Sequence, residues 1–122
     1  MKHTMTIAAI ALLATVGITG TSHAGAEQKC ATCHNFDSSN KVGPGLGGII
    51  GRPAGKLEGF KYGPGLSDAN WNWDEAKLRE WMCNSKDAVK KFTGDDKAKT
   101  KMPPQKVCDP AAQNEVLAKL KG

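Results

Sequence analysis

Cys30, Cys33 and His34 form a C-x-x-C-H motif, which constrains this 122-residue chain more than any other feature. Cysteines at this spacing share one face of a helical turn, so both thiols can bond to the vinyl groups of a haem while the adjacent imidazole reaches its iron. A thioredoxin-like redox pair would need a βαβ pattern, and a zinc site would need another ligand pair. Neither pattern is found in the sequence. The motif therefore predicts one covalently attached haem c, bound through Cys30 and Cys33, with His34 as an axial ligand to the iron.

The first 24 residues have the pattern of a cleavable secretion signal. Lys2 precedes an apolar stretch over residues 7–18, and the S-H-A sequence at 22–24 offers small residues for signal peptidase. A membrane anchor is the alternative, but small and polar residues leave the continuous apolar part shorter than a bilayer span. We therefore expect residues 1–24 to be removed, residues 25–122 to form a single domain, and the protein to be periplasmic.

Two further cysteines remain once Cys30 and Cys33 are bonded to the haem. These are Cys83 and Cys108, and an oxidising compartment would allow them to form a disulfide. The alternative is a pair of free buried thiols. Because Met102 lies between them in the sequence, a disulfide would clamp the loop that contains this methionine.

Helix start and stop signals predict an all-α domain. About a hundred residues would remain after cleavage, with few aromatic residues and many glycines and prolines, which suits short helices and loops around a flat apolar group. A first helix is expected over residues 27–34, ending near Asn35. A second is expected over residues 72–83, with Asn72 as its cap and Glu75 reaching back to it.

The C-terminal half contains two more helix signals. A short helix is expected over residues 85–92, with Gly94 stopping it. The last helix has Asp109 as its N-cap and Pro110 at its first position. Nothing alternates over enough residues to predict a strand. The last helix presents a buried apolar stripe of Val116, Leu117 and Leu120.

A second axial ligand would distinguish an electron carrier from a catalyst, because an iron with both axial positions filled has no open site. His34 is the only histidine after residue 24, which excludes a second histidine ligand unless His23 survives cleavage. Methionine is the remaining strong ligand. Met82 lies on the apolar stripe of a predicted helix, where it would fill the core. Met102 lies in an irregular, proline-containing segment at 99–104 that could present its sulfur to the iron, so we predict Met102 as the ligand.

From residue 30 to residue 120, these features resemble the class I c-type cytochromes, in particular small periplasmic relatives of mitochondrial cytochrome c. The K-V-G-P-G-L sequence at 41–46 resembles the family segment next to the haem. The resemblance implies that the Pro44 carbonyl accepts a hydrogen bond from the proximal histidine and that Leu46 packs on the ring. A tight turn without that role is the alternative for Pro44.

Further family motifs follow at matching spacing, namely G-R at residue 52, G-F-K-Y ending at residue 62, and N-W-D-E around residue 73. The resemblance implies that Arg52, Tyr62 and Trp73 order and hydrogen-bond the haem propionates. Each of these side chains carries a donor that a buried carboxylate needs. The T-K-M sequence matches the segment that ends in the family's axial methionine, here Met102.

The resemblance implies a cytochrome c fold, with three or four short helices and loops wrapped around one covalently bound haem. It implies a one-electron carrier, not an enzyme, acting between respiratory or photosynthetic redox partners through a six-coordinate iron. One alternative is a haem subunit of a dehydrogenase complex. Another is a gas-binding or catalytic haem protein with a labile methionine, for which Asp95 and Asp96 would be the only nearby acids.

The chain departs from the family pattern in three places. Cleavage after residue 24 would leave the usual N-terminal helix missing or much shortened, so the apolar stripe of the last helix would lose its expected partner. Trp81 stands where the family often has a tyrosine near the methionine sulfur, and Pro104 replaces a common aromatic residue. We expect the disulfide to compensate for the lost helix contacts.

The formal net charge of +5 indicates acidic redox partners, with no nucleic acid, and a monomer that makes transient contact with membrane complexes. Removal of Lys2 with the secretion signal would lower this charge by one. The lysines expected to frame the exposed haem edge and steer docking are Lys29, Lys41, Lys86, Lys90, Lys97, Lys99, Lys101 and Lys106.

Overall fold

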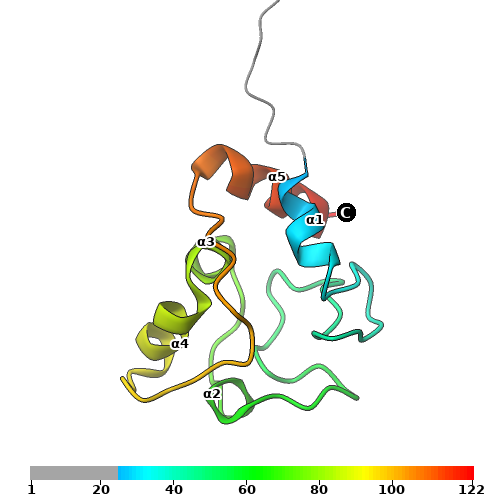
Figure 1. Cartoon of the computed structure of the whole chain (residues 1–122). Helices are drawn as coiled ribbons and strands as arrows, with labels where there is room; N and C mark the ends of the chain where they lie inside the picture. Colours follow the sequence, from blue (N-terminus) through cyan, green and yellow to red (C-terminus); the bar gives the residue numbers. More distant parts are fainter. Residues whose placement is uncertain (1–24) are drawn as a thin grey trace, which may run out of the picture.

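The computed structural model describes residues 25–122, so the expected secretion signal at 1–24 lies outside the described residues. Within the described part the chain is helical, and its only β-type pairing is one isolated bridge. This confirms the all-α fold predicted from the sequence. No helix in residues 25–122 has the length and apolar character needed to cross a membrane. The helices are α1 (Ala26–Ala31), α2 (Pro64–Ser67), α3 (Glu75–Cys83), α4 (Ser85–Thr93) and α5 (Pro110–Leu120) (Figure 1). A single residue separates α3 from α4, and longer loops join the other helices.

The first helix is shorter than predicted, because α1 ends at Ala31 rather than near Asn35. It nevertheless packs directly against α5, as Figure 1 also shows. Cys30 of α1 belongs to the same buried cluster as Val116 and Leu117 of α5. The expectation that the α5 stripe would lack a partner was therefore wrong, since even a short helix covers this face.

The start of α3 also differs from the prediction. The helix begins after Asp74, whose carboxylate accepts a hydrogen bond from the Lys77 backbone N–H at 2.7 Å and so acts as the N-cap. Asn72, the predicted cap, instead has extended backbone and pairs with the preceding loop in the isolated bridge. The Glu75 carboxylate does not reach back to Asn72, because it pairs with Lys121 at the end of α5, at 2.5 Å.

The remaining helix boundaries agree closely with the sequence signals. α4 ends where Gly94 adopts a left-handed conformation with φ 70°, which glycine accommodates without steric cost. α5 begins at Pro110, directly after Asp109, as predicted. The short helix α2, which begins at Pro64, has too few residues for a periodic pattern and was not predicted.

An aromatic cluster fills the space between α3, α4 and the loop that precedes α3. The Trp73 and Trp81 rings meet edge to face with their centroids 5.1 Å apart. Phe92 of α4 packs against Trp71 at 5.6 Å. Aromatic side chains contribute large buried areas, and contacts of this geometry add to that stabilisation. Through Trp73 and Trp81, the cluster forms part of one wall of an apolar cavity.

Candidate functional site

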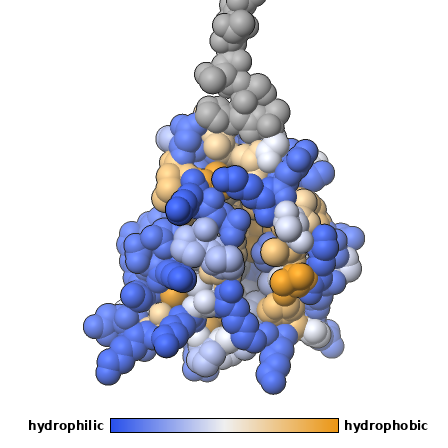
Figure 2. All heavy atoms as spheres, in the orientation of Figure 1, coloured by the Kyte–Doolittle hydropathy of each residue, from blue (hydrophilic) through white to orange (hydrophobic). Residues whose placement is uncertain are grey.

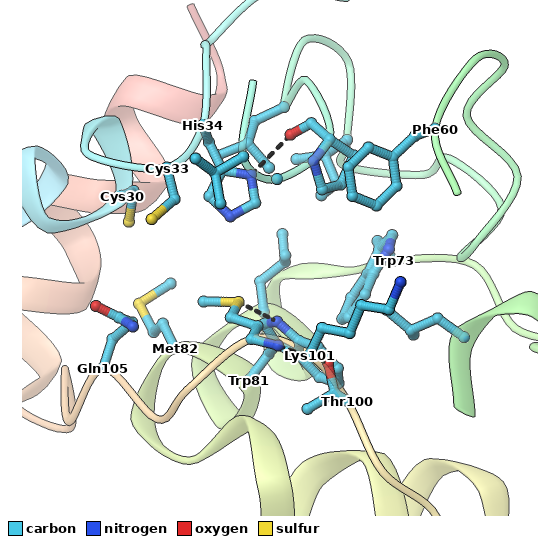
Figure 3. A pocket seen from close by; sticks show the side chains of 18 of the residues that line it. Cys30, Cys33, His34, Phe60, Trp73, Trp81, Met82, Thr100, Lys101 and Gln105 are labelled. Atoms are coloured by element: carbon cyan, nitrogen blue, oxygen red, sulfur yellow. Dashed lines mark hydrogen bonds between the residues drawn. The ribbon is translucent and has the colours of Figure 1, made fainter. Parts of the chain in front are cut away.

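One apolar cavity of about 310 Å³ is surrounded by loops and helices from most of the described chain. Figure 2 shows hydrophilic side chains over much of one face of the molecule, with a hollow between them. Figure 3 shows Cys30, Cys33 and His34 on one side of this cavity, and Trp81 and Met82 on the opposite side. The structure thus brings together residues predicted separately from the sequence. The predicted residues that line the cavity are Cys30, Cys33, His34, Pro44, Leu46, Arg52, Tyr62, Trp73 and Met102.

The His34 imidazole is oriented by the loop behind it. Its Nδ1 lies 2.7 Å from the carbonyl oxygen of Pro44 (Figure 3). A carbonyl oxygen only accepts, so Nδ1 carries the proton and donates, which leaves the lone pair on Nε2 free to bind a metal. The loop passes very close to the ring, because a Cβ atom added at Gly43 would lie 2.7 Å from Nδ1. Gly43 and Pro44 therefore hold the imidazole in one orientation and one tautomer.

Neither cysteine of the motif takes part in the disulfide, and Cys30 is buried while Cys33 is partly buried. Burial raises the pKa of the Cys30 thiol, and the nearby Glu27 carboxylate adds to the effect. A redox-active cysteine pair normally has the opposite property, a lowered pKa that exposes a reactive thiolate. A zinc site needs several ligands together, and no group of three or more His, Cys, Asp or Glu side chains suited to a metal occurs within residues 25–122.

Met102 lies on the opposite wall of the cavity from the histidine. The Trp81 indole N–H donates to its Sδ at 3.0 Å, an interaction drawn in Figure 3. The Ser85 hydroxyl donates to its backbone carbonyl at 2.8 Å. Met82 also reaches the cavity wall, but from within α3, where its side chain is buried in the core. Both methionines are therefore near the cavity, and only Met102 has its sulfur held by a side-chain donor among the described hydrogen bonds.

Polar side chains lie around the rest of the cavity. Arg52 donates to the carbonyl oxygens of Gly45 and Gly47, both at 3.0 Å, and so holds the loop that carries Pro44. The Tyr62 hydroxyl accepts a hydrogen bond from the backbone N–H five residues earlier, at 3.3 Å. Figure 3 shows the indole nitrogen of Trp73 facing the end of the cavity below Phe60.

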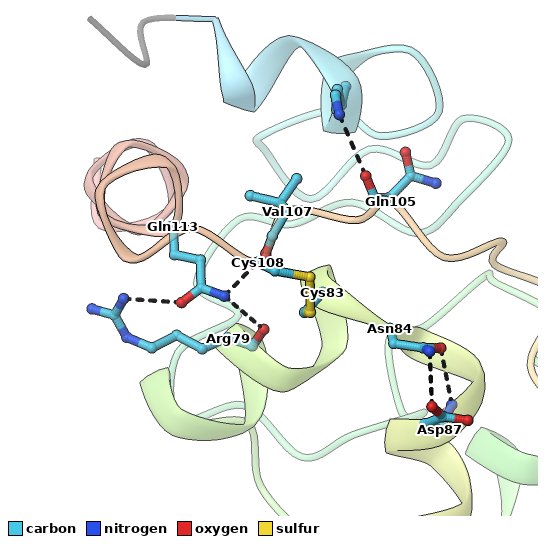
Figure 4. Close-up of a disulfide and its surroundings, with 9 residues drawn as sticks. Arg79, Cys83, Asn84, Asp87, Gln105, Val107, Cys108 and Gln113 are labelled. Atoms are coloured by element: carbon cyan, nitrogen blue, oxygen red, sulfur yellow. Dashed lines mark hydrogen bonds between the residues drawn. A yellow bond between two sulfur atoms is a disulfide. The ribbon is translucent and has the colours of Figure 1, made fainter. Parts of the chain in front are cut away.

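The disulfide lies directly behind the wall that carries the methionine. Cys83 at the end of α3 is bonded to Cys108 just before α5, with their Cα atoms 4.5 Å apart (Figure 4). Beside it, the Val107 backbone N–H donates to the Met82 carbonyl at 3.0 Å. The Gln113 side-chain amide then donates to the Val107 carbonyl, also at 3.0 Å. The segment that leads from Met102 to α5 is therefore attached to the end of α3 at several points.

Sequence reasoning missed two residues around this site. Ser85 carried only the ordinary signal of a helix start after Asn84, and nothing local indicates that its hydroxyl turns inward. Gln113, which is 7% exposed, is a polar residue at a buried position of α5. Its position in register with Val116 and Leu117 was the one available signal, because these residues share a helix face.

The donor set of the cavity fits one haem c. Two thiols one helical turn apart can form thioethers, an imidazole lone pair is available on one wall, and a thioether sulfur is available on the other. The walls between them are mostly apolar, as a porphyrin requires, and an indole donor faces one end, as a propionate requires. Fold and cavity together define a small helical c-type cytochrome.

Comparison with known proteins agrees with this class, although no family model matches the chain. It is 35% identical over 82 residues to cytochrome c2 of Pararhodospirillum photometricum, covering 63% of this chain and 73% of that protein. It is 37% identical over 117 residues to cytochrome c2 of Cereibacter sphaeroides, covering 84% of this chain and 81% of that protein. The solved structure of cytochrome c2 from Rhodobacter sphaeroides matches with a TM-score of 0.70 and 35% identity, covering 81% of this chain and 90% of the other. The chain belongs to the class I c-type cytochromes.

Membership of this family establishes the general activity of the protein. It is a monohaem electron-carrier cytochrome and not an enzyme, and its cofactor is one covalently bound haem c with iron. The fold and cofactor predicted from the sequence are thereby confirmed.

Proposed function

We propose that His34 and Met102 are the two axial ligands of the haem iron and that the protein carries single electrons between periplasmic redox partners. The observation that supports this most directly is that the Met102 sulfur lines the cavity and accepts a hydrogen bond from Trp81, which lies on the wall opposite His34 (Figure 3). Each of the two side chains is held in place by a hydrogen bond, one to Pro44 and one from Trp81. Ligands held in this way change little in position when the charge of the site changes.

Bound haem supplies an iron that alternates between the ferric and ferrous states. In this proposal the chain attaches the group through Cys30 and Cys33 and excludes water from it with apolar side chains such as Leu46. The hydrogen bond from His34 to Pro44 makes the imidazole more basic and so influences the potential. With both His34 and Met102 bound to it, the iron would have no open position for a substrate, and electron transfer would make and break no bonds.

The propionate end of the haem would lie near Trp73, Tyr62 and Arg52. Trp73 supports this assignment best, because its indole nitrogen faces the cavity. Arg52 already donates to two loop carbonyls, so its first role is to hold the loop in place while its positive charge stabilises a nearby carboxylate. The Tyr62 hydroxyl accepts one backbone hydrogen bond and retains its own proton for donation.

The mature protein in this proposal consists of residues 25–122 as a single domain, secreted to the periplasm after removal of residues 1–24. The sequence of the first segment supports secretion, with Lys2 before an apolar stretch and small residues at its end. The bond between Cys83 and Cys108 is consistent with this location, because disulfides persist in oxidising compartments.

The mouth of the cavity has the properties expected of a docking surface for acidic partners. Lys29 and Lys101 line the cavity. Val42 also lines it and is 75% exposed, which provides an apolar contact at the same place. An apolar centre surrounded by positive charge suits brief, electrostatically steered association with an acidic surface. A monomer can associate with its partners in this way. The other lysines predicted to steer docking are exposed as well, namely Lys41, Lys86, Lys90, Lys97, Lys99 and Lys106.

Absorption spectra of the periplasmically expressed protein test the ligand assignment. We expect the ferric protein to show the weak near-infrared sulfur-to-iron band and the ferrous protein to leave its spectrum unchanged under carbon monoxide. Ready binding of carbon monoxide by the wild-type protein would instead indicate an open iron and a gas-binding or catalytic haem protein.

Two variants assign the ligand to one methionine. Met102→Ala should abolish the near-infrared band and allow carbon monoxide to bind, whereas Met82→Leu should retain the band, because it replaces a buried core side chain by one of similar volume. The opposite pattern would make Met82 the ligand and contradict the proposal.

A further inference from the structure

Ser85 is a completely buried polar residue at the first position of α4. It is 0% exposed, and its hydroxyl donates to the Met102 carbonyl oxygen at 2.8 Å, 17 residues away in the sequence. A hydroxyl at a helix start usually serves the helix itself. Here that task is already done by the neighbouring Asn84, whose side chain accepts from the Asp87 backbone N–H at 3.2 Å. The Ser85 hydroxyl is therefore available to bond to the loop that contains Met102 (residues 99–105), called here the methionine loop.

The loop around Met102 has few other connections to the helices. Pro103 and Pro104 follow it directly and have no backbone N–H to donate. Among the described residues, the hydrogen bonds from segment 99–105 to α3 and α4 are the one from Ser85 to the Met102 backbone and the one from Trp81 to its sulfur. Beyond this segment, Lys106 is the next residue that donates from its backbone to α3.

We propose that Ser85 is a positioning residue that holds the Met102 backbone against α4 and so keeps the sulfur available to the iron. This rests on the proposed ligation by Met102. The hydroxyl touches neither the sulfur nor the haem site directly, and its effect passes through the backbone of the ligand residue. Without it, the buried Met102 carbonyl loses its donor, and the loop gains freedom to move away from the cavity.

Loss of the Ser85 hydroxyl should make Met102 compete less well with external ligands for the iron. An imidazole molecule can bind ferric iron only in the fraction of molecules whose methionine has left, so its apparent affinity reports that fraction. For Ser85→Ala we expect imidazole to bind ferric protein roughly tenfold more tightly than it binds wild type. The near-infrared sulfur-to-iron band should weaken in the same protein.

A stability-matched control separates positioning from a general loss of stability. Ala88 lies in the same helix and is 3% exposed, but it makes no described hydrogen bond to the methionine loop through its side chain. Ala88→Gly should destabilise α4 and leave imidazole affinity within about twofold of wild type. Ser85→Cys, whose thiol is somewhat larger than the hydroxyl and donates only weakly, should fall between wild type and Ser85→Ala.

The outcomes distinguish this inference from the ligand assignment. Equal imidazole affinity in wild type and Ser85→Ala, or equal increases in Ser85→Ala and Ala88→Gly, would overturn the role of Ser85 while leaving Met102 as the ligand. A wild-type protein without the near-infrared band would overturn the ligation by Met102, and the role of Ser85 with it.

Discussion

Removal of the disulfide should lower the stability of the fold and allow the methionine loop more freedom to move. The bond links residues separated by 25 positions, and the enclosed chain contains all of α4 together with Met102. Serine at positions 83 and 108 differs from cysteine by one oxygen in place of sulfur, so it keeps nearly the same shape while adding a hydroxyl. The variant therefore removes the covalent link with little other change to the surroundings.

The size of the effect follows from loop entropy. A cross-link that closes a loop of 25 residues removes conformational freedom from the unfolded chain worth about 3.5 kcal/mol at 25 °C. For a domain of this size, that loss of stability corresponds to a decrease of roughly 15–25 °C in the melting temperature. The neighbouring hydrogen bonds of Val107 and Gln113 remain possible, so the folded structure should be retained at low temperature.

Unfolding of the double serine variant and of wild type should be compared in denaturant and by heating. A second measurement compares the stability of wild type in ascorbate with its stability in dithiothreitol. Ascorbate reduces the iron and leaves the disulfide intact, whereas dithiothreitol reduces both. Because the iron is ferrous in both treatments, the difference in stability gives the contribution of the disulfide. We expect both measurements to give similar losses of stability. We also expect the ferric variant to bind imidazole more tightly than ferric wild type does.

A loss of stability below about 1 kcal/mol in both measurements would refute the loop-entropy argument, since it predicts several times more. Unchanged imidazole affinity together with a large loss of stability would refute only the expectation that the disulfide restrains Met102. In that case the disulfide would stabilise the fold without restraining Met102.

Three further predictions concern the sulfur, the surface and the helix cap. If Met102 is the ligand as proposed, Trp81→Phe should lower the reduction potential by tens of millivolts in a redox titration, because a sulfur without the N–H donor binds ferric iron more strongly; an unchanged or higher potential would contradict this. Electron transfer with an acidic partner, followed by stopped flow, should slow steeply as ionic strength rises, and a flat salt profile would argue against a lysine-rich docking surface. The Lys77 backbone N–H holds the pKa of Asp74 below its ordinary value of 3.8, so the stability from this cap is complete above pH 3.8 and is lost as the pH falls through the lower folded-state pKa. Asp74→Asn keeps an acceptor oxygen and should flatten this part of the acid unfolding curve; an unchanged curve would exclude a role for Asp74.

Local sequence patterns predicted much of the fold because their physical causes are local. A left-handed glycine ends a helix wherever it occurs, so Gly94 indicated the end of α4 correctly. Asn72 and Asp74 are both good caps, and the choice between them depended on a bridge to a distant loop. Sequence signals alone could not include that bridge, and the predicted helix start was therefore wrong.

The haem-binding chemistry could be recognised from the sequence for a similar reason. Cys30, Cys33 and His34 are covalently close, so their spacing alone brings two thiols and an imidazole to one side of a helical turn. Counting the remaining histidines and methionines then limited the second ligand to very few residues. The class of cofactor thus depends on short-range geometry, which a single helical turn is enough to provide.

The environment of the site depends on contacts between residues far apart in the chain. Trp81 reaches the Met102 sulfur across 21 residues, and Ser85 reaches the Met102 backbone across 17. Neither hydrogen bond follows from residue type, because an indole or a hydroxyl can face solvent equally well on an isolated helix. The sequence alone therefore determined the class of cofactor and predicted the groups that would bind it. The packing of α3 and α4 against the loop around Met102 determined how those groups are held, since only the folded chain excludes water from the donors.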